Sequence, residues 1–182
     1  MLLLTDIDQC LLDYASALHL YMANRNIPAI HQINDVYYPT EAFGEIVYSM
    51  DYDFETSPEF ASMPPFRDSI NAMKWFIEND WQIVCISAAS DNKNTLNLRK
   101  QNFINVFGFV PEIIHTNGYK NHILKNYQPA IWVDDQPYHY NEGVTSSHTS
   151  YLMDHNYNKH EVNMNRIGNW GDLIEKLQSN ES

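Results

Sequence analysis

Short apolar runs alternate along this chain with longer stretches in which apolar residues recur at helical spacing. The apolar runs predict buried strands over residues 2–5, 81–86, 110–115, 130–133 and 150–153. The amphipathic stretches predict helices over residues 11–26, 67–80, 92–105, 119–127 and 170–177. Strands that alternate with helices indicate right-handed crossover connections and a parallel sheet covered on both faces. The sequence therefore predicts an α/β fold with a doubly wound parallel sheet.

Residues 27–65 interrupt this alternation. Aromatic and acidic residues crowd the segment, and prolines at positions 28, 39, 58, 64 and 65 divide it into short pieces. This composition favours a small helical insertion over a second sheet. At 182 residues the chain is long enough for one domain with a proper core. We expect a core formed by residues 1–26 and 66–182, with the insertion at 27–65.

Polar side chains follow three of the predicted strands. Asp6 and Asp8 follow the first, on the same side of the extended chain; Ser87 follows the second, and Asp134 and Asp135 follow strand 130–133. Ligands of such sheets bind beyond the carboxyl ends of the strands, so we expect these groups to converge. Neighbouring carboxylates repel unless a cation lies between them, and Mg²⁺ prefers oxygen ligands. The alternative is that Asp6 caps the next helix and Asp8 is a solvated loop residue.

Four carboxylates and a hydroxyl suit phosphoryl transfer through a covalent aspartyl intermediate. Asp6 would be the nucleophile, and Asp8 would be the general acid and base, a role that needs an elevated pKa. Asp134 and Asp135 would hold Mg²⁺ together with Asp6 and the backbone carbonyl of Asp8. Ser87 would donate a hydrogen bond to a phosphate oxygen.

In order and separation, Asp6-x-Asp8, Ser87 and Asp134-Asp135 resemble motifs I, II and IV of the haloacid dehalogenase superfamily of phosphatases. The resemblance implies a Rossmann-like catalytic core. The insertion falls where that superfamily carries its small helical type-one cap. The cap would exclude water while the phosphoryl ester forms and admit it afterwards.

Two parts of the motif pattern are less regular. The lysine of motif III has two candidates: Lys100, at the position used by the deoxyribonucleotidase branch, and Lys120, at the position used by most others. We favour Lys100 slightly, with Lys93 and Lys120 as additional phosphate contacts, and the alternative for each lysine is a solvated helix face. Gln9 and Cys10 stand where the superfamily usually has a glycine or other residue followed by threonine or valine.

A narrower resemblance is to the 5'(3')-deoxyribonucleotidase family. It rests on four stretches: Asp13-Tyr14, residues 37–43 (YYPTEAF), residues 60–65 (FASMPP) and residues 166–170 (RIGNW). The resemblance implies that Tyr14, Tyr37 and Tyr38 hold the sugar and base, because bases stack on aromatic rings. Ordinary packing is the alternative for each tyrosine. We therefore expect a Mg²⁺-dependent phosphatase of (deoxy)nucleoside monophosphates; a sugar-phosphate phosphatase or a decayed nucleotide-binding module is the alternative.

Composition narrows the expected partners. The 11 basic and 23 acidic residues give a formal charge of −12, which argues against nucleic acid and anionic membranes but allows a small phosphate ester beside a metal ion. Cys10 and Cys85 show neither a disulfide framework nor zinc spacing, so we expect reduced thiols. The opening apolar run is too short for a signal peptide, and we expect a cytoplasmic protein. The sequence leaves open whether two copies of the chain form a homodimer.

Overall fold

The core of the molecule is a parallel six-stranded sheet. The computed structural model describes residues 1–36, 38–88, 90 and 92–180. The strands are β1 (Leu2–Thr5), β2 (Gln82–Ser87), β3 (Glu112–His115), β4 (Ile131–Asp134), β5 (Thr149–Met153) and β6 (Arg166–Ile167). They lie in the order β3-β2-β1-β4-β5-β6, and every neighbouring pair is parallel. This confirms the predicted α/β class, with β1 at the centre.

Helices connect the strands much as the periodicity predicted. They are α1 (Tyr14–Ala23), α2 (Pro39–Phe43), α3 (Val47–Glu55), α4 (Ser69–Glu78), α5 (Lys93–Phe107), α6 (Asn121–Leu124), α7 (Pro137–Thr145) and α8 (Trp170–Asn180). Helix α1 begins three residues later than predicted, because the Asp13 side chain accepts a hydrogen bond from the Ser16 amide and caps it there. None of the described helices is long and apolar enough to cross a membrane.

Among the described α-helices and strands outside the insertion, α7 and β6 were not predicted. Helix α7 was missed because its residues, PYHYNEGVT, offer a polar and aromatic pattern with little aliphatic periodicity. Strand β6 is only two residues long, which is too short to give a strand pattern, so the prediction that the sheet ends with strand 150–153 is wrong.

Apolar side chains fill both faces of the sheet. Leu3 of β1 belongs to the larger apolar cluster, with residues of α4, α5 and α8, whereas Leu4 faces a smaller cluster that includes Leu124 of α6. Helix α7 packs closely on β4 and β5. Gly143 makes this possible, because a Cβ atom there would collide with the Trp132 side chain. The sheet is thus covered on both sides, as a doubly wound fold requires.

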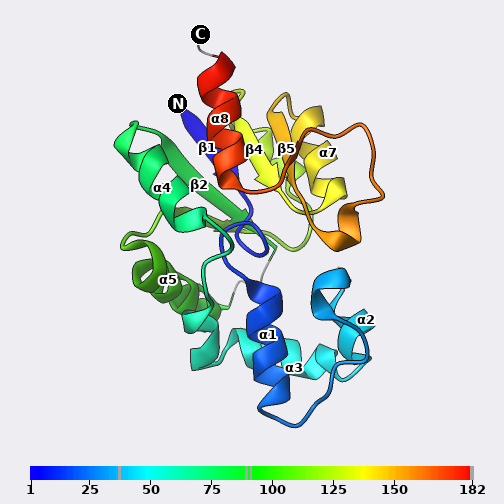
Figure 1. The fold of residues 1–182 in the computed structure, drawn as a ribbon. Coiled ribbons are helices and arrows are strands. Elements are labelled where there is room, and N and C mark those ends of the chain that lie inside the picture. The colour runs from blue at the N-terminus through cyan, green and yellow to red at the C-terminus, as the bar shows by residue number, and fades with distance from the viewer. Residues whose placement is uncertain (37, 89, 91, 181–182) are drawn as a thin grey trace.

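The insertion lies at the carboxyl end of the strands, below the sheet in Figure 1. In its described residues it consists of α2, α3 and the 3₁₀ turns η1 (Ile33–Asp35) and η2 (Pro58–Ser62), without a strand, as its composition predicted. Phe54 and Phe60 are fully buried and pack edge to face with ring centroids 5.6 Å apart. They belong to the same apolar cluster as Leu3, so the insertion packs directly on the core. That residues 27–65 form a separate cap domain stays a prediction.

Candidate active site

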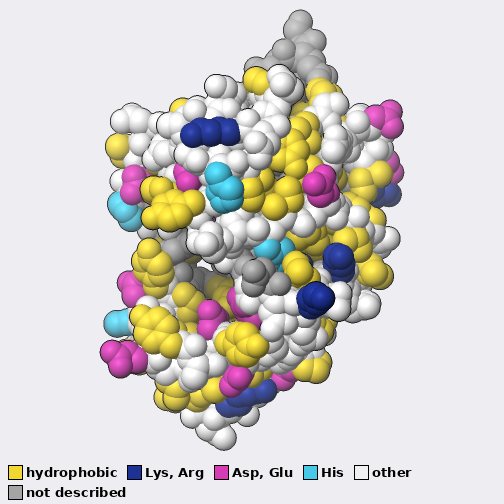
Figure 2. Space-filling model, turned by 180° about the vertical axis from the view of Figure 1, so that it is seen from behind, with side chains coloured by type: hydrophobic (Ala, Val, Ile, Leu, Met, Phe, Trp, Pro, Cys, Tyr) yellow, Lys and Arg dark blue, Asp and Glu magenta, His cyan; other side chains and the backbone are white. Residues whose placement is uncertain are grey.

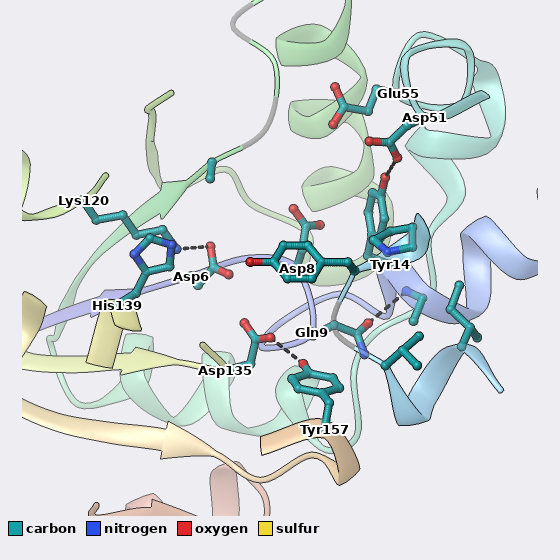
Figure 3. A pocket seen from close by; sticks show the side chains of 16 residues that line it. Asp6, Asp8, Gln9, Tyr14, Asp51, Glu55, Lys120, Asp135, His139 and Tyr157 are labelled. Carbon is teal, nitrogen blue, oxygen red and sulfur yellow. Dashed lines mark hydrogen bonds and ion pairs between the residues drawn. The ribbon is translucent and has the colours of Figure 1, made fainter. Parts of the chain in front are cut away.

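A cavity of about 420 Å³ lies between the carboxyl ends of the strands and the insertion. Seen from behind, acidic and hydrophobic side chains gather around a hollow in the lower half of the molecule (Figure 2). The residues that line the cavity come from the loop after β1, from α1, from the insertion and from the segments that follow β2, β3, β4 and β5 (Figure 3). They are Asp6, Asp8, Gln9, Tyr14, Ala15, Ile33, Val36, Tyr38, Pro39, Asp51, Glu55, Ala88, Lys120, Asp135, His139 and Tyr157.

Asp6 lies directly beyond central strand β1 and is paired with Lys120. The Lys120 Nζ is 2.8 Å from Asp6 Oδ1 and 2.8 Å from Asp134 Oδ2. All three residues are buried. Burial raises the pKa of Asp6, and Lys120 opposes that rise. The ammonium group therefore helps to keep Asp6 an ionised carboxylate, which a nucleophile must be.

Asp8 lies beside Asp6 and is held by a buried arginine. Arg99 Nη2 donates to Asp8 Oδ2 at 2.7 Å, and the Ser87 hydroxyl donates to the same oxygen at 3.4 Å. The Arg99 guanidinium also lies over the Phe60 ring, 4.3 Å from its centroid. Burial raises the pKa of Asp8, while Arg99 lowers it. A carboxyl group with a raised pKa that faces a cavity suits a general acid and base.

The structure reverses our preference between the two lysines. Lys100 and Lys93 lie on α5 with exposed side chains and do not line the cavity, whereas Lys120 is buried within it. On a helix, neighbouring residues point about 100° apart, so Arg99 faces Asp8 and Lys100 faces solvent. The cation that α5 places beside Asp8 is therefore Arg99, the residue next to the predicted Lys100.

Asp135 and Asp134 have different environments, although the sequence suggested both as metal ligands. Both carboxylate oxygens of Asp134 are engaged: Oδ2 pairs with Lys120, and Oδ1 accepts from the Gln136 amide at 2.8 Å. Asp135 instead lines the cavity and accepts a hydrogen bond from the Tyr157 hydroxyl. Burial, and then the nearby Asp134 carboxylate, raise the pKa of Asp135 well above its usual range. Asp135 is thus the better placed of the two to bind a cation.

The donor set fits a divalent metal ion. Carboxylate oxygens of Asp6 and Asp135 lie within 4.8 Å of each other, and both residues are buried. Two desolvated carboxylates at this separation repel unless a cation lies between them. Oxygen donors of this kind are the ligands that Mg²⁺ prefers.

The loop after β1 is held in place by His155, from the segment that follows β5. Gln9 has a positive φ of 57°, a strained conformation for a residue with a side chain. Its carbonyl accepts a hydrogen bond from His155 Nε2 at 2.9 Å, and its side-chain oxygen accepts from the Ala15 amide at 3.0 Å. The His155 ring stacks between Phe66 and Tyr157, with centroid distances of 5.0 and 4.8 Å. This stack of rings ends at the cavity wall.

Helix α1 and the insertion contribute acceptors and aromatic side chains opposite the strand ends. The Tyr14 hydroxyl donates to Asp51 of α3, and Glu55 lies one helical turn further on (Figure 3). Burial raises the pKa of Glu55 to about 7, and Asp51 adds to the rise. Tyr14 and Tyr38 line the cavity, whereas Tyr37 lies outside the described residues.

Several cavity residues were missed from the sequence. Tyr157 and His139 both line the cavity, but neither is among the candidate residues that the sequence indicates. His139 Nδ1 lies 2.7 Å from Glu142 Oε2, and the same oxygen accepts from the Lys120 amide at 3.0 Å. A histidine and a glutamate three residues apart on a helix, such as His139 and Glu142, are too common a pattern to mark His139 as a cavity residue.

Comparison with solved structures identifies the fold. A haloacid dehalogenase-like hydrolase from Streptococcus pneumoniae has a TM-score of 0.67 and 9% identity, covering 97% of this chain and 98% of that chain. D,D-heptose 1,7-bisphosphate phosphatase from B. bronchiseptica, complexed with magnesium and phosphate, has a TM-score of 0.63 and 14% identity over 98% of both chains. An L-2-haloacid dehalogenase has a TM-score of 0.62 and 10% identity, covering 97% of this chain and 98% of that chain.

No protein-family model and no curated protein matches the sequence. The structural neighbours include a phosphatase and a dehalogenase, so the likeness alone does not select a reaction. What it establishes is architecture: the chain has the Rossmann-like α/β fold of haloacid dehalogenase-like hydrolases, as its strand-end motifs predicted.

Proposed function

We propose that this chain is a Mg²⁺-dependent phosphomonoesterase that forms an aspartyl-phosphate on Asp6. The observation that carries the proposal is the pair of carboxylates after β1. Asp6 is held by a buried lysine and Asp8 by a buried arginine, and both face one cavity. One carboxylate is therefore equipped as a nucleophile, and its neighbour as a proton donor and acceptor.

The reaction then follows in two steps. An Asp6 carboxylate oxygen attacks phosphorus, the bond from phosphorus to the leaving oxygen breaks, and Asp8 gives its proton to that oxygen. Asp8, now ionised, takes a proton from water as the water oxygen attacks the phosphorus of the aspartyl-phosphate. The Asp6–phosphorus linkage breaks, which releases inorganic phosphate and restores Asp6. Lys120 and the Ser87 hydroxyl lie close enough to this centre to stabilise the negative charge on the phosphoryl oxygens.

Asp6 and Asp135 would hold the metal ion, with the backbone carbonyl of Asp8 as a further oxygen donor. When bound, Mg²⁺ would offset the charge of the phosphoryl group and of the two carboxylates. The heptose bisphosphate phosphatase with a similar fold was crystallised with magnesium and phosphate, which supports this choice.

We further propose a nucleoside monophosphate as the substrate. A cavity of about 420 Å³ is within the usual range for a small ligand. Tyr14, Tyr38 and Tyr157 offer rings for a planar group, and stacking of a base contributes roughly 1–3 kcal/mol. Asp51 and Glu55 offer acceptors for hydroxyl or amino groups of the leaving alcohol. The same acceptors suit a sugar, so a sugar phosphate is the second candidate.

Phosphate release from a panel of esters tests the proposal. The panel pairs deoxyribo- and ribonucleoside monophosphates with sugar phosphates, each with Mg²⁺ and with a chelator. Asp6→Asn should abolish turnover while the fold persists. Asp53→Asn is the matched control, because Asp53 is an exposed carboxylate on α3 and does not line the cavity.

The outcomes separate the parts of the proposal. Metal-dependent release led by nucleoside monophosphates would support all of it. Similar slow release from every ester would leave the catalytic centre standing and reject the nucleotide reading of the cavity. Unchanged turnover by Asp6→Asn would reject the mechanism, and tight nucleotide binding without turnover would instead indicate a binding module.

A further inference from the structure

We propose that the Cys10 thiol is an additional ligand of the metal site, so that this site binds thiophilic divalent ions such as Cd²⁺ and Zn²⁺ more tightly than Mg²⁺. The sulfur of Cys10 and carboxylate oxygens of Asp6 and Asp135 lie within 4.8 Å of one another, and all three residues are buried. The inference rests on the proposed metal site but not on its substrate.

The separation of the three donors is close to what a small metal ion requires. Bonds of about 2.0–2.2 Å to oxygen and about 2.3 Å to sulfur place the ligand atoms of a tetrahedral site roughly 3.5 Å apart. An upper limit of 4.8 Å therefore leaves about 1 Å of adjustment. Rotation of a side chain can supply a movement of that size.

The charges around the three donors also favour a cation. Lys120 is shared between Asp6 and Asp134. Within the described part of the chain, no Lys, Arg or His forms an ion pair with Asp135, whose carboxylate accepts from the Tyr157 hydroxyl. A divalent ion would compensate this buried carboxylate, and the thiol would release its proton to solvent on binding.

The sulfur is what changes the metal preference. Mg²⁺ takes oxygen ligands almost exclusively, whereas thiolates select softer ions. Oxygen donors alone would make a magnesium site, and the addition of one thiolate makes the same site competitive for Zn²⁺ and Cd²⁺. The structure thus assigns Cys10 a role that its place in the apolar cluster would otherwise conceal.

Cadmium titration of the purified protein without substrate tests this inference. A thiolate–cadmium bond gives a charge-transfer absorption in the ultraviolet, which binding by oxygen alone does not. We expect that band in the native protein and its loss in Cys10→Ser, together with a roughly tenfold or greater loss of Cd²⁺ affinity. Mg²⁺ affinity, measured by competition, should change far less.

Cys85→Ser is the matched control, because Cys85 is the second buried thiol, lies on β2 and is not part of the three-donor group. It should keep the band, and Asp135→Asn should weaken it. Cys10→Thr is a second test if the serine variant unfolds, as judged by circular dichroism. No band in the native protein, or a band that persists without the Cys10 sulfur, would overturn the inference. Mg²⁺-dependent turnover without the band would reject the thiol ligand alone, whereas a band without turnover would reject only the proposed function.

Discussion

Replacement of Lys120 by methionine should destabilise the fold in a pH-dependent way. The ammonium group is buried and lies 2.8 Å from a carboxylate oxygen of both Asp6 and Asp134. Removal of one partner from a buried ion pair costs about 3–5 kcal/mol, because the remaining charge is left uncompensated. Total stabilities of single domains are about 5–15 kcal/mol, so this variant should lose a large part of its stability.

The sign of the pH dependence follows from the carboxylates that are left. Lys120→Met removes the main group that opposes the effect of burial on the pKa of Asp6 and leaves only the weaker backbone hydrogen bond of Ile7 to lower it, so that pKa should rise further. An acid whose pKa is higher in the folded state than in the unfolded state binds a proton on folding. Stability is then lost as the pH rises through the folded-state pKa. The variant should therefore be more strongly destabilised near about pH 8 than near about pH 5.

Urea denaturation of both proteins at these two pH values measures the effect. Lys125→Met is the matched control, since Lys125 is exposed just beyond α6 and should change stability by no more than about 0.5 kcal/mol. A loss below about 1 kcal/mol for Lys120→Met, or an equal loss at both pH values, would refute the reasoning. Phosphate release by any folded Lys120→Met should fall by roughly 10²–10³-fold, as expected when a donor to the developing charge is removed.

Three further predictions concern residues around this centre. Arg99→Met should cost roughly 3 kcal/mol in urea unfolding and lower kcat more than it raises KM, because Asp8 loses the partner that orients it, and Arg99→Lys should restore part of both. Burial lowers the pKa of His155 to about 4, so its contribution to stability is present above about pH 6.5 and is lost as the pH falls toward 4. His155→Gln should therefore make the urea midpoint depend less on pH across that range, and an unchanged pH dependence would contradict the assignment. Gly143→Ala should cost about 1–3 kcal/mol in thermal unfolding, because its methyl group meets Trp132, and a neutral effect would show that α7 can shift freely.

The sequence predicted the parts of the site that depend on strand ends. Asp6, Asp8 and Asp135 line the cavity and each follows an apolar run, and Ser87 ends another such run and contacts Asp8. Parallel strands bring these carboxyl ends to one edge of the sheet. Local pattern and topology are sufficient for that inference. The same reasoning could not separate Asp134 from Asp135, since adjacent residues differ in surroundings that only the folded structure supplies.

The other parts of the site depend on tertiary packing. The rotation of α5 about its axis decides whether Arg99 or Lys100 faces Asp8. A periodic pattern with few aliphatic residues does not fix that rotation to within one residue. Tyr157 reaches Asp135 from a short 3₁₀ turn whose position is set by stacking of Tyr157 on His155, which itself stacks on Phe66, and by hydrogen bonds from Asn158 to the backbone. Such contacts have no signature in the sequence alone.

The central place of β1 has a consequence for how the chain folds during synthesis. Leu2 pairs with Gln82 and Leu3 with Ile131, so the partners on its two sides are made 80 and 128 residues later. Pairings this distant in sequence are slow to form, and an apolar strand without its neighbours is prone to aggregate. The strand that carries the proposed nucleophile must therefore wait for most of the chain to leave the ribosome. Chaperone dependence during translation should be greatest before β4 emerges.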